Sequence, residues 1–229
     1  MDLEYRAIDR ERTPFGLLEL RHYRAATGEE GYEITLDGAF LMASHGSHAE
    51  RAMAGLAYDR LGERRDGLTV LVGGLGAGHT LRAVLDLDGV DRVVVCEIGA
   101  QVVEWNRRWF ADANGQAVDD PRVEIEIADV TAVLQAARES FDLVLLDVDN
   151  GPGWLASPSN ARLYGASGLA SVRAALRPQG VAAVWSPAPN PTFESEVAAA
   201  GVGFERVDTT ELGRREREPG STIYLLRSS

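Results

Sequence analysis

Five short apolar runs alternate with helical stretches from residue 68 onward, and this order constrains the fold more than any other feature. The expected strands are residues 69–73, 92–97, 122–127, 141–147 and 180–186. The expected helices are residues 78–87, 100–111, 131–138, 161–176 and 192–200. Because the strands are largely apolar and helices separate them, the pattern predicts a parallel sheet covered by helices on both faces.

Two further apolar runs and an N-terminal region complete the predicted architecture. Residues 204–209 and 222–226 have no helical pattern between them, which predicts an antiparallel hairpin at one edge of a seven-stranded, mostly parallel α/β sheet. Residues 32–36 alternate cleanly and are followed by Asp37-Gly38, a strong hairpin signal. We therefore expect a small β-hairpin subdomain over residues 1–45 and a Rossmann-like nucleoside-binding catalytic domain over 46–229. The subdomain could be a lid, a dimer surface or a simple extension.

Composition limits the function of the chain. It has 229 residues, 45% of them hydrophobic, and a formal net charge of −12. This charge argues against nucleic-acid binding, and it fits either a cationic substrate or simple solubility. No apolar run could span a membrane, and the acidic start at Met1–Glu4 is unlike a signal peptide, so we expect a cytoplasmic enzyme without a membrane partner. The single cysteine, Cys96, is expected to be a buried core residue.

A glycine-rich turn follows the first predicted core strand. Gly73, Gly74, Gly76 and Gly78 allow a tight turn with positive φ and close approach of a ligand to the backbone. Such a turn also occurs without a ligand. Glu97 ends the next strand about 20 residues later, where this architecture places an acid that binds the ribose hydroxyls. Together the two features predict a nucleoside site for an adenosine-type cofactor.

Polar residues follow other predicted strands, at the edge where ligands of such sheets bind. Asp129 could accept a hydrogen bond from an adenine amino group or cap the helix that follows it. Asp147 could act as a general base toward an attacking amine, with Asp149 and Asn150 orienting it. The competing interpretation of this segment is a turn whose polar residues only fix the backbone.

A predicted helix over residues 47–61 contributes further candidates. Ser47 and Glu50 have the spacing of a capping box at its start. His48 beside them is a candidate for substrate contact or local hydrogen bonding, and with no further ligands nearby we expect no metal. Trp154, in the loop after the acidic segment, is a candidate wall of the substrate site. His79 is expected to be a surface residue.

These pieces, in this order, resemble the spermidine synthase family of polyamine biosynthesis, the aminopropyltransferases built on the class I S-adenosylmethionine-dependent methyltransferase fold. The resemblance rests on the hairpin at 36–38, the loop at 73–74, residues 96–98, Asp129, residues 141–142 with Asp147, and residues 176–181. It implies that Glu97 holds the ribose, that Asp129 contacts the adenine edge and that Asp147 is the catalytic carboxylate. It also implies a possible homodimer.

The chain departs from the family at three places. The family carries an acid in its glycine loop that holds the donor's aminopropyl amine, where this chain has Gly76. It carries Tyr-Gln where this chain has His48-Ala49, and a second acid where this chain has Asn150.

Three functions therefore remain open. The leading hypothesis is aminopropyl transfer from decarboxylated S-adenosylmethionine to a small amine acceptor. The alternative is methyl transfer from S-adenosylmethionine to a small molecule, which Gly76 favours because a loop acid would repel the donor's carboxylate. The third is a non-catalytic nucleoside-binding protein.

Overall fold

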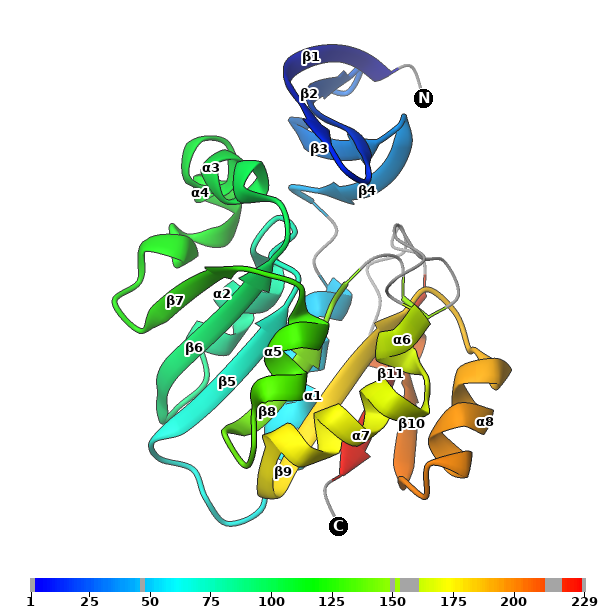
Figure 1. The fold of residues 1–229 in the computed structure, drawn as a ribbon. Coiled ribbons are helices and arrows are strands. Elements are labelled where there is room, and N and C mark those ends of the chain that lie inside the picture. The colour runs from blue at the N-terminus through cyan, green and yellow to red at the C-terminus, as the bar shows by residue number, and fades with distance from the viewer. Residues whose placement is uncertain (1–2, 46–47, 149–150, 153–160, 213–219, 228–229) are drawn as a thin grey trace.

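A seven-stranded sheet forms the centre of the molecule in the computed structural model, which describes residues 3–45, 48–148, 151–152, 161–212 and 220–227 (Figure 1). Its strands are β5 (Leu68–Gly73), β6 (Val90–Glu97), β7 (Val123–Ile127), β8 (Phe141–Leu146), β9 (Leu176–Ser186), β10 (Phe204–Asp208) and β11 (Thr222–Arg227). They lie in the order β10-β11-β9-β8-β5-β6-β7. Neighbouring strands from β7 to β9 pair in parallel, whereas β11 pairs antiparallel with both β9 and β10. The predicted sheet and its terminal hairpin are confirmed.

The strand order reverses between β5 and β8, and this places their ends next to each other. Gly73 pairs with Leu146 in parallel register, and the Asp147 N–H donates to the Gly73 carbonyl at 2.9 Å. Gly74 in turn donates to the Cys96 carbonyl at the end of β6, also at 2.9 Å. In open α/β sheets the crevice at such a reversal binds ligands, so the fold brings the three predicted strand ends to one place.

Helices cover both faces of the sheet, as predicted. One face is covered by α1 (His48–Asp59), α2 (His79–Leu85), α3 (Ala100–Arg108), the short α4 (Ala111–Asn114) and the 3-10 turn η1 (Ala117–Asp119). The other face is covered by α5 (Val130–Ala136), α6 (Ala161–Tyr164), α7 (Ala166–Ala175) and α8 (Pro191–Ala199). Another 3-10 turn, η3 (Thr209–Leu212), lies between β10 and β11. Alternate side chains of one strand enter the two layers: Val70 and Val72 pack on the first, Leu71 on the second.

The largest differences from the predicted boundaries lie between residues 161 and 186. The helix expected over 161–176 is divided at Gly165, whose backbone is extended, into α6 and α7. A Cβ at Gly168 would lie 2.1 Å from the Leu163 carbonyl oxygen, so the two short helices pack closer than any residue with a side chain at 168 would allow. Strand β9 begins at Leu176, earlier than the expected residue 180, because Leu176 already pairs with Phe141 of β8.

The N-terminal region forms a four-stranded antiparallel sheet that lies over the carboxyl ends of the large sheet (Figure 1). Its strands, in spatial order, are β1 (Leu3–Thr13), β2 (Gly16–Ala25), β3 (Glu30–Leu36) and β4 (Ala39–Ala43). Asp37 and Gly38 both have positive φ, as the hairpin between β3 and β4 requires. Strand β1 was not predicted separately, because most of its residues are exposed and show no apolar alternation.

The small sheet shares its core with the first helical layer. Leu20 and Ile34 are fully buried and belong to the same apolar cluster as Met53 of α1 and Leu81 of α2. The boundary expected at residue 45 thus lies between two sheets that share one apolar core.

Candidate functional site

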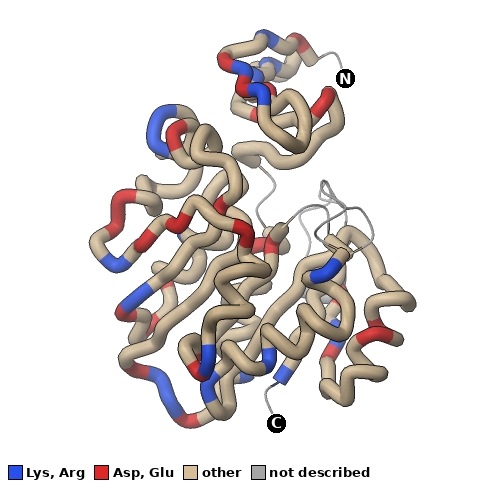
Figure 2. The backbone as a smooth tube through the Cα atoms, in the orientation of Figure 1, with Lys and Arg blue, Asp and Glu red and all other residues tan. Residues whose placement is uncertain are grey.

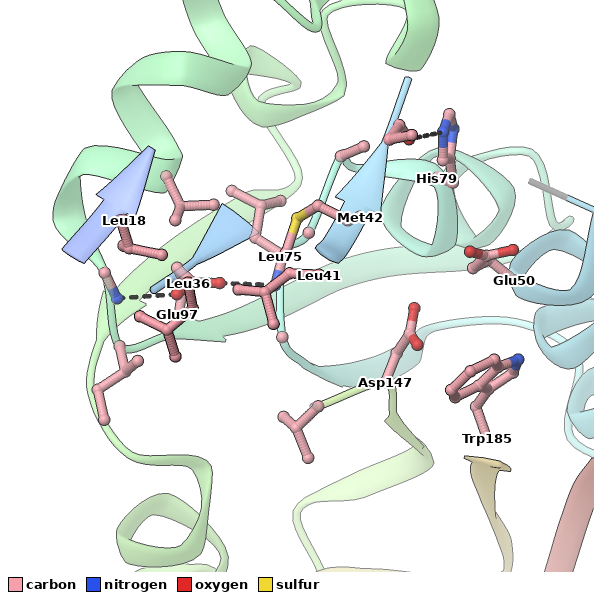
Figure 3. A pocket seen from close by; sticks show the side chains of 18 of the residues that line it. Leu18, Leu36, Leu41, Met42, Glu50, Leu75, His79, Glu97, Asp147 and Trp185 are labelled. Atoms are coloured by element: carbon pink, nitrogen blue, oxygen red, sulfur yellow. Dashed lines mark hydrogen bonds between the residues drawn. The ribbon is translucent and has the colours of Figure 1, made fainter. Parts of the chain in front are cut away.

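A cavity of about 740 Å³ lies between the N-terminal sheet and the carboxyl ends of β5, β6 and β8. This volume is in the range of small-molecule sites. Leu18, Leu36, Leu41 and Met42 line it from the small sheet, and Leu75 lines it from the glycine turn (Figure 3). The N-terminal sheet therefore forms part of the wall of the predicted ligand crevice.

The charges that line the cavity are mostly negative. Of the described lining residues, Arg12 is the only Lys or Arg, and the acids are Glu11, Glu50, Glu97, Asp129 and Asp147. Over the molecule as a whole, Asp and Glu are spread across both sheets and several helices (Figure 2). With five acids to one arginine, the described lining is still more acidic than the whole chain, which has 35 Asp and Glu to 23 Lys and Arg, and it suits a cationic ligand.

Two of the four predicted glycines line the cavity, namely Gly74 and Gly76. Gly73 and Gly78 are not among its lining residues. Gly74, Gly76 and Gly78 have positive φ, as predicted for the turn. A Cβ would lie 2.3 Å from the Asp147 carbonyl oxygen at Gly74, and 2.7 Å from the Asn114 amide at Gly78. Close packing inside the protein therefore requires glycine at these two positions, independently of any ligand.

Two buried asparagines, which the sequence analysis did not identify, hold this turn in place. Asn106 of α3 donates through Nδ2 to the Gly76 carbonyl at 2.8 Å. Asn114 donates to Asn106 Oδ1 at 2.8 Å and to the Ala77 carbonyl at 3.3 Å. Both side chains are fully buried. In the sequence, Asn106 is one polar residue beside Val102, Val103 and Trp105, which does not specify a partner 30 residues away, and the short segment around Asn114 has no apolar pattern.

Glu97 ends β6 as predicted, and its carboxylate is held by the backbone of the glycine turn. Oε2 accepts from the Leu75 N–H at 3.0 Å and Oε1 accepts from the Gly99 N–H at 2.8 Å. Burial raises the pKa of the Glu97 carboxyl, and hydrogen bonds from these backbone N–H groups oppose that rise. The backbone N–H groups of Ile98 and Gly76 add to this effect, so four N–H groups stabilise the ionised form of the carboxylate where it lines the cavity.

Asp129 has the capping role that was one of its two predicted alternatives. Its Oδ1 accepts from the Thr131 N–H at 2.8 Å at the start of α5. The residue also lines the cavity, so the contact with adenine remains compatible with the cap and stays a prediction.

Asp147 follows β8 and directs its carboxylate into the cavity (Figure 3). Thr80 of α2 donates through Oγ1 to Asp147 Oδ2 at 2.7 Å. Burial raises the pKa of Asp147, and the Thr80 hydrogen bond opposes this rise. The other predicted members of this segment, Asp149 and Asn150, lie outside the described residues, as does Trp154.

Three histidines line the cavity, namely His45, His48 and His79. His48 lines the cavity, its Nε2 has no hydrogen-bond partner among the described residues, and its contact with substrate stays a prediction. The expectation that His79 is a surface residue is wrong, because it is only 6% exposed. The end of β4 covers the start of α2 there, and His79 Nε2 lies 3.3 Å from the Ala43 carbonyl. A long-range contact of this kind leaves no signal in the local sequence.

Glu50 and Trp185 also line the cavity, and neither was identified as a site residue from the sequence (Figure 3). Glu50 was interpreted only as a member of a capping box, whose other member, Ser47, lies outside the described residues. Trp185, near the end of β9, has a buried Nε1 without a hydrogen-bond partner in the described part of the chain. Both residues become candidates only once the fold is known.

Replacing Glu97 by Ala should weaken binding of methylthioadenosine by about 1–3 kcal/mol, roughly 5- to 150-fold. The variant removes the acceptor expected to bind the ribose and also frees the Leu75 N–H. Calorimetric titration would measure the loss. Glu124→Ala on neighbouring β7 is the matched control, because Glu124 forms only an exposed ion pair with Arg92. Unchanged affinity in the Glu97 variant would remove the ribose assignment.

Other classes of site find no support among the described residues. No group of three or more His, Cys, Asp or Glu side chains there could hold a metal ion. No described helix is long and apolar enough to cross a membrane. Cys96 is buried, as expected, and burial raises the pKa of its thiol to about 12.

The strand order, the reversal between β5 and β8 and the cavity at that point define a Rossmann-like α/β protein of the class I methyltransferase type. Residues 53–199 match the spermine/spermidine synthase domain. The chain belongs to the spermine/spermidine synthase family.

Individual relatives agree with this assignment. A polyamine aminopropyltransferase from Thermoanaerobacter sp. (strain X514) is 32% identical over 137 residues, which cover 60% of this chain and 47% of the relative. The crystal structure of spermidine synthase from Thermotoga maritima covers 98% of this chain and 73% of its own, with a TM-score of 0.74 at 19% identity. The structure of a spermidine synthase in complex with the transition state analogue AdoDATO matches with a TM-score of 0.76 at 18% identity. The match covers 98% of this chain and 74% of that chain. The chain spans about half the length of the curated relative that it matches.

Proposed function

We propose that this chain transfers an aminopropyl group from decarboxylated S-adenosylmethionine to a small amine, with Asp147 as the general base. The observation that carries the proposal is the position of Asp147. Its carboxylate lies at the strand reversal, inside the cavity that Glu97 also lines. A base and a nucleoside-binding acid in one cavity are what such a transfer requires.

The donor's position follows from the residues at the ends of β6 and β7. Glu97 would accept hydrogen bonds from the ribose hydroxyls, and Asp129 would accept one from the adenine amino group. The positively charged sulfonium of the donor suits a cavity with five acids and one arginine among its described lining residues. The apolar side chains of Leu41, Met42 and Leu75 would exclude water around it.

The reaction is a displacement at the carbon that joins the aminopropyl group to sulfur. The lone pair of the neutral acceptor amine forms the new C–N bond, and the C–S bond breaks with its electrons going to sulfur. The displacement releases methylthioadenosine and forms a secondary ammonium ion, which becomes the neutral secondary amine when it loses one proton. Asp147, in its ionised form, takes a proton from the attacking nitrogen, and Thr80 holds the carboxylate in position.

Methyl transfer from S-adenosylmethionine is the second candidate, and one observation favours it. The described part of the turn at 74–77 reads Gly-Leu-Gly-Ala and supplies no acid. A Cβ placed at Gly76 would lie 3.5 Å from Sδ of Met42, so this position of the turn faces an apolar side chain. This apolar surface neither attracts an aminopropyl ammonium nor repels a donor carboxylate.

Calorimetric titration with S-adenosylmethionine, its decarboxylated form and methylthioadenosine separates the two candidates. We expect the decarboxylated donor to bind about tenfold or more tightly than S-adenosylmethionine, because the acidic lining repels a carboxylate. Incubation with that donor and a linear diamine should release methylthioadenosine. Release of S-adenosylhomocysteine from S-adenosylmethionine would instead establish methyl transfer. Binding of none of the three ligands would overturn both candidates.

A further inference from the structure

We propose that Asn106 and Asn114 are positioning residues for nucleoside binding, which act on the ligand through Gly76 and Glu97. This deepens the proposed function and rests on its assignment of Glu97 to the ribose. Neither asparagine is among the described residues that line the cavity. Their effect on a ligand would therefore pass through the glycine turn, whose residues 74–77 do line it.

The two asparagine side chains form a hydrogen-bond network with one possible orientation. The carbonyls of Gly76 and Val102 can only accept, so the amide nitrogen of Asn106 must face both of them, at 2.8 and 2.9 Å. The oxygen of Asn106 then faces Asn114, whose amide nitrogen donates to it at 2.8 Å and to the Ala77 carbonyl at 3.3 Å. Each amide nitrogen thus has two acceptors, and a buried network satisfied in this way holds its members rigidly.

The glycine turn is held from two sides. The asparagines bind the carbonyls of residues 76 and 77, whereas Glu97 binds N–H groups, among them that of Leu75 at 3.0 Å. Burial raises the pKa of the Glu97 carboxyl, and the N–H groups of Leu75 and Gly76 are among those that oppose the rise. Gly76 therefore links the two sides within one residue, because its carbonyl binds Asn106 and its N–H stabilises the ionised carboxylate of Glu97.

The backbone of the turn needs such a restraint. Gly76 and Gly78 have φ values of +55° and +81°, and glycine adopts several other conformations at little cost. A Cβ at Gly78 would lie 2.7 Å from the amide nitrogen of Asn114 and 2.9 Å from Oδ1 of Asn106. The glycine at position 78, which does not line the cavity, thus leaves room for the asparagine pair that fixes the turn.

Loss of Asn106 should affect the ribose contact in particular. Without its buried donor, the Gly76 carbonyl is free to move, and the Gly76 N–H no longer holds Glu97 in one orientation. A carboxylate that binds ribose hydroxyls depends on that orientation. Asp147 should keep its place, because Thr80 holds it through a separate hydrogen bond at 2.7 Å.

The test compares, by calorimetry, the binding of methylthioadenosine with that of its 2′-deoxy analogue, which lacks one ribose hydroxyl. The wild type should bind the analogue about tenfold more weakly. Asn106→Ala should weaken methylthioadenosine about 5- to 30-fold and reduce the difference between the two ligands to within about threefold. A merely structural role would weaken both ligands equally and leave their ratio unchanged, which would overturn the proposal.

A double variant tests whether Asn106 acts through Glu97. When Glu97→Ala is already present, adding Asn106→Ala should weaken methylthioadenosine by no more than about twofold. An additional loss as large as that in the wild type would contradict the proposal. Asn190→Ala is the matched control, because it removes another hydrogen bond from a backbone N–H to an asparagine, at the start of α8 and outside the cavity lining. It should leave both affinities within about twofold of the wild type.

Asn114→Ala provides the same comparison if Asn106→Ala does not fold. It removes the contact with the Ala77 carbonyl and leaves the one between Asn106 and Gly76, so methylthioadenosine should bind about threefold more weakly or worse. The ratio between the two ligands should again fall. An unchanged ratio in this variant would overturn the proposal.

The outcomes separate this proposal from the proposed reaction. A wild type that binds methylthioadenosine but transfers neither group would refute the reaction and leave the positioning role standing. A wild type that does not distinguish the two ligands would refute both the ribose assignment and the positioning role. Where turnover occurs, Asn106→Ala should raise KM for the donor and keep kcat within about threefold. A fall in kcat at unchanged KM would overturn the proposal.

Discussion

Replacing Asp147 by Asn should lower kcat by roughly 10²- to 10⁴-fold, the usual contribution of a general base. Asn has the same shape, and its side-chain oxygen can still accept the hydrogen bond from Thr80. The cavity should therefore keep its form, and affinity for methylthioadenosine should stay within about twofold of the wild type. Steady-state kinetics and calorimetry on the same preparation would measure both effects. Loss of binding in parallel with activity would contradict the role of Asp147 as a base.

The pH profile gives this prediction a second, independent readout. A general base must be ionised, so kcat/KM should rise with pH through the pKa of Asp147. Because burial raises that pKa above the ordinary value of 3.8, the rise should occur at higher pH than for an exposed aspartate. Thr80→Val removes the hydrogen bond that opposes the shift, so its profile should move to still higher pH. An identical profile in Thr80→Val would show that another group controls the rise.

Replacing Gly74 by Ala should destabilise the protein by about 3 kcal/mol or more. Gly74 has a φ of +87°, which is strained for an alanine. The added Cβ would also lie 2.3 Å from the Asp147 carbonyl oxygen, a backbone atom at the end of β8 that has little freedom to move. The substitution thus forces the ends of β5 and β8 apart, and activity should fall together with stability. Urea unfolding would measure the change in the free energy of unfolding.

Two other glycines separate the contributions to this effect. Gly28 has the same φ of +87° but nothing within 4 Å of an added Cβ, so Gly28→Ala should cost only roughly 1–2 kcal/mol of backbone strain. Gly55 lies within α1 with open space around it, and Gly55→Ala should stabilise by about 0.5–1 kcal/mol. If Gly74→Ala lowers the free energy of unfolding by no more than Gly28→Ala does, the close contact with the Asp147 carbonyl is not the reason that position 74 requires glycine.

The order of strands and helices in the large sheet was predictable because it depends on local patterns. Each buried strand is a continuous apolar run, and each helix between them has its own periodicity, so few parallel topologies remain. The same reasoning predicted the hairpin at Asp37-Gly38, because two adjacent residues determine that turn. It also placed Glu97, Asp129 and Asp147 at strand ends, which a parallel sheet brings to one edge. Strand β1 was missed because it is mostly exposed and therefore has no apolar alternation.

The sequence by itself determined the fold class, the glycine turn and the acids at the strand ends, because these depend on residues close together in the chain. Only the tertiary structure decided which side chains share the cavity. His79 is buried because β4 covers it, and Glu50 faces Asp147 from a helix almost 100 residues earlier in the chain. Asn106 holds the turn at Gly76 across 30 residues. Such contacts depend on how α1, α3 and the N-terminal sheet pack on the large sheet, and that packing has no local sequence signal.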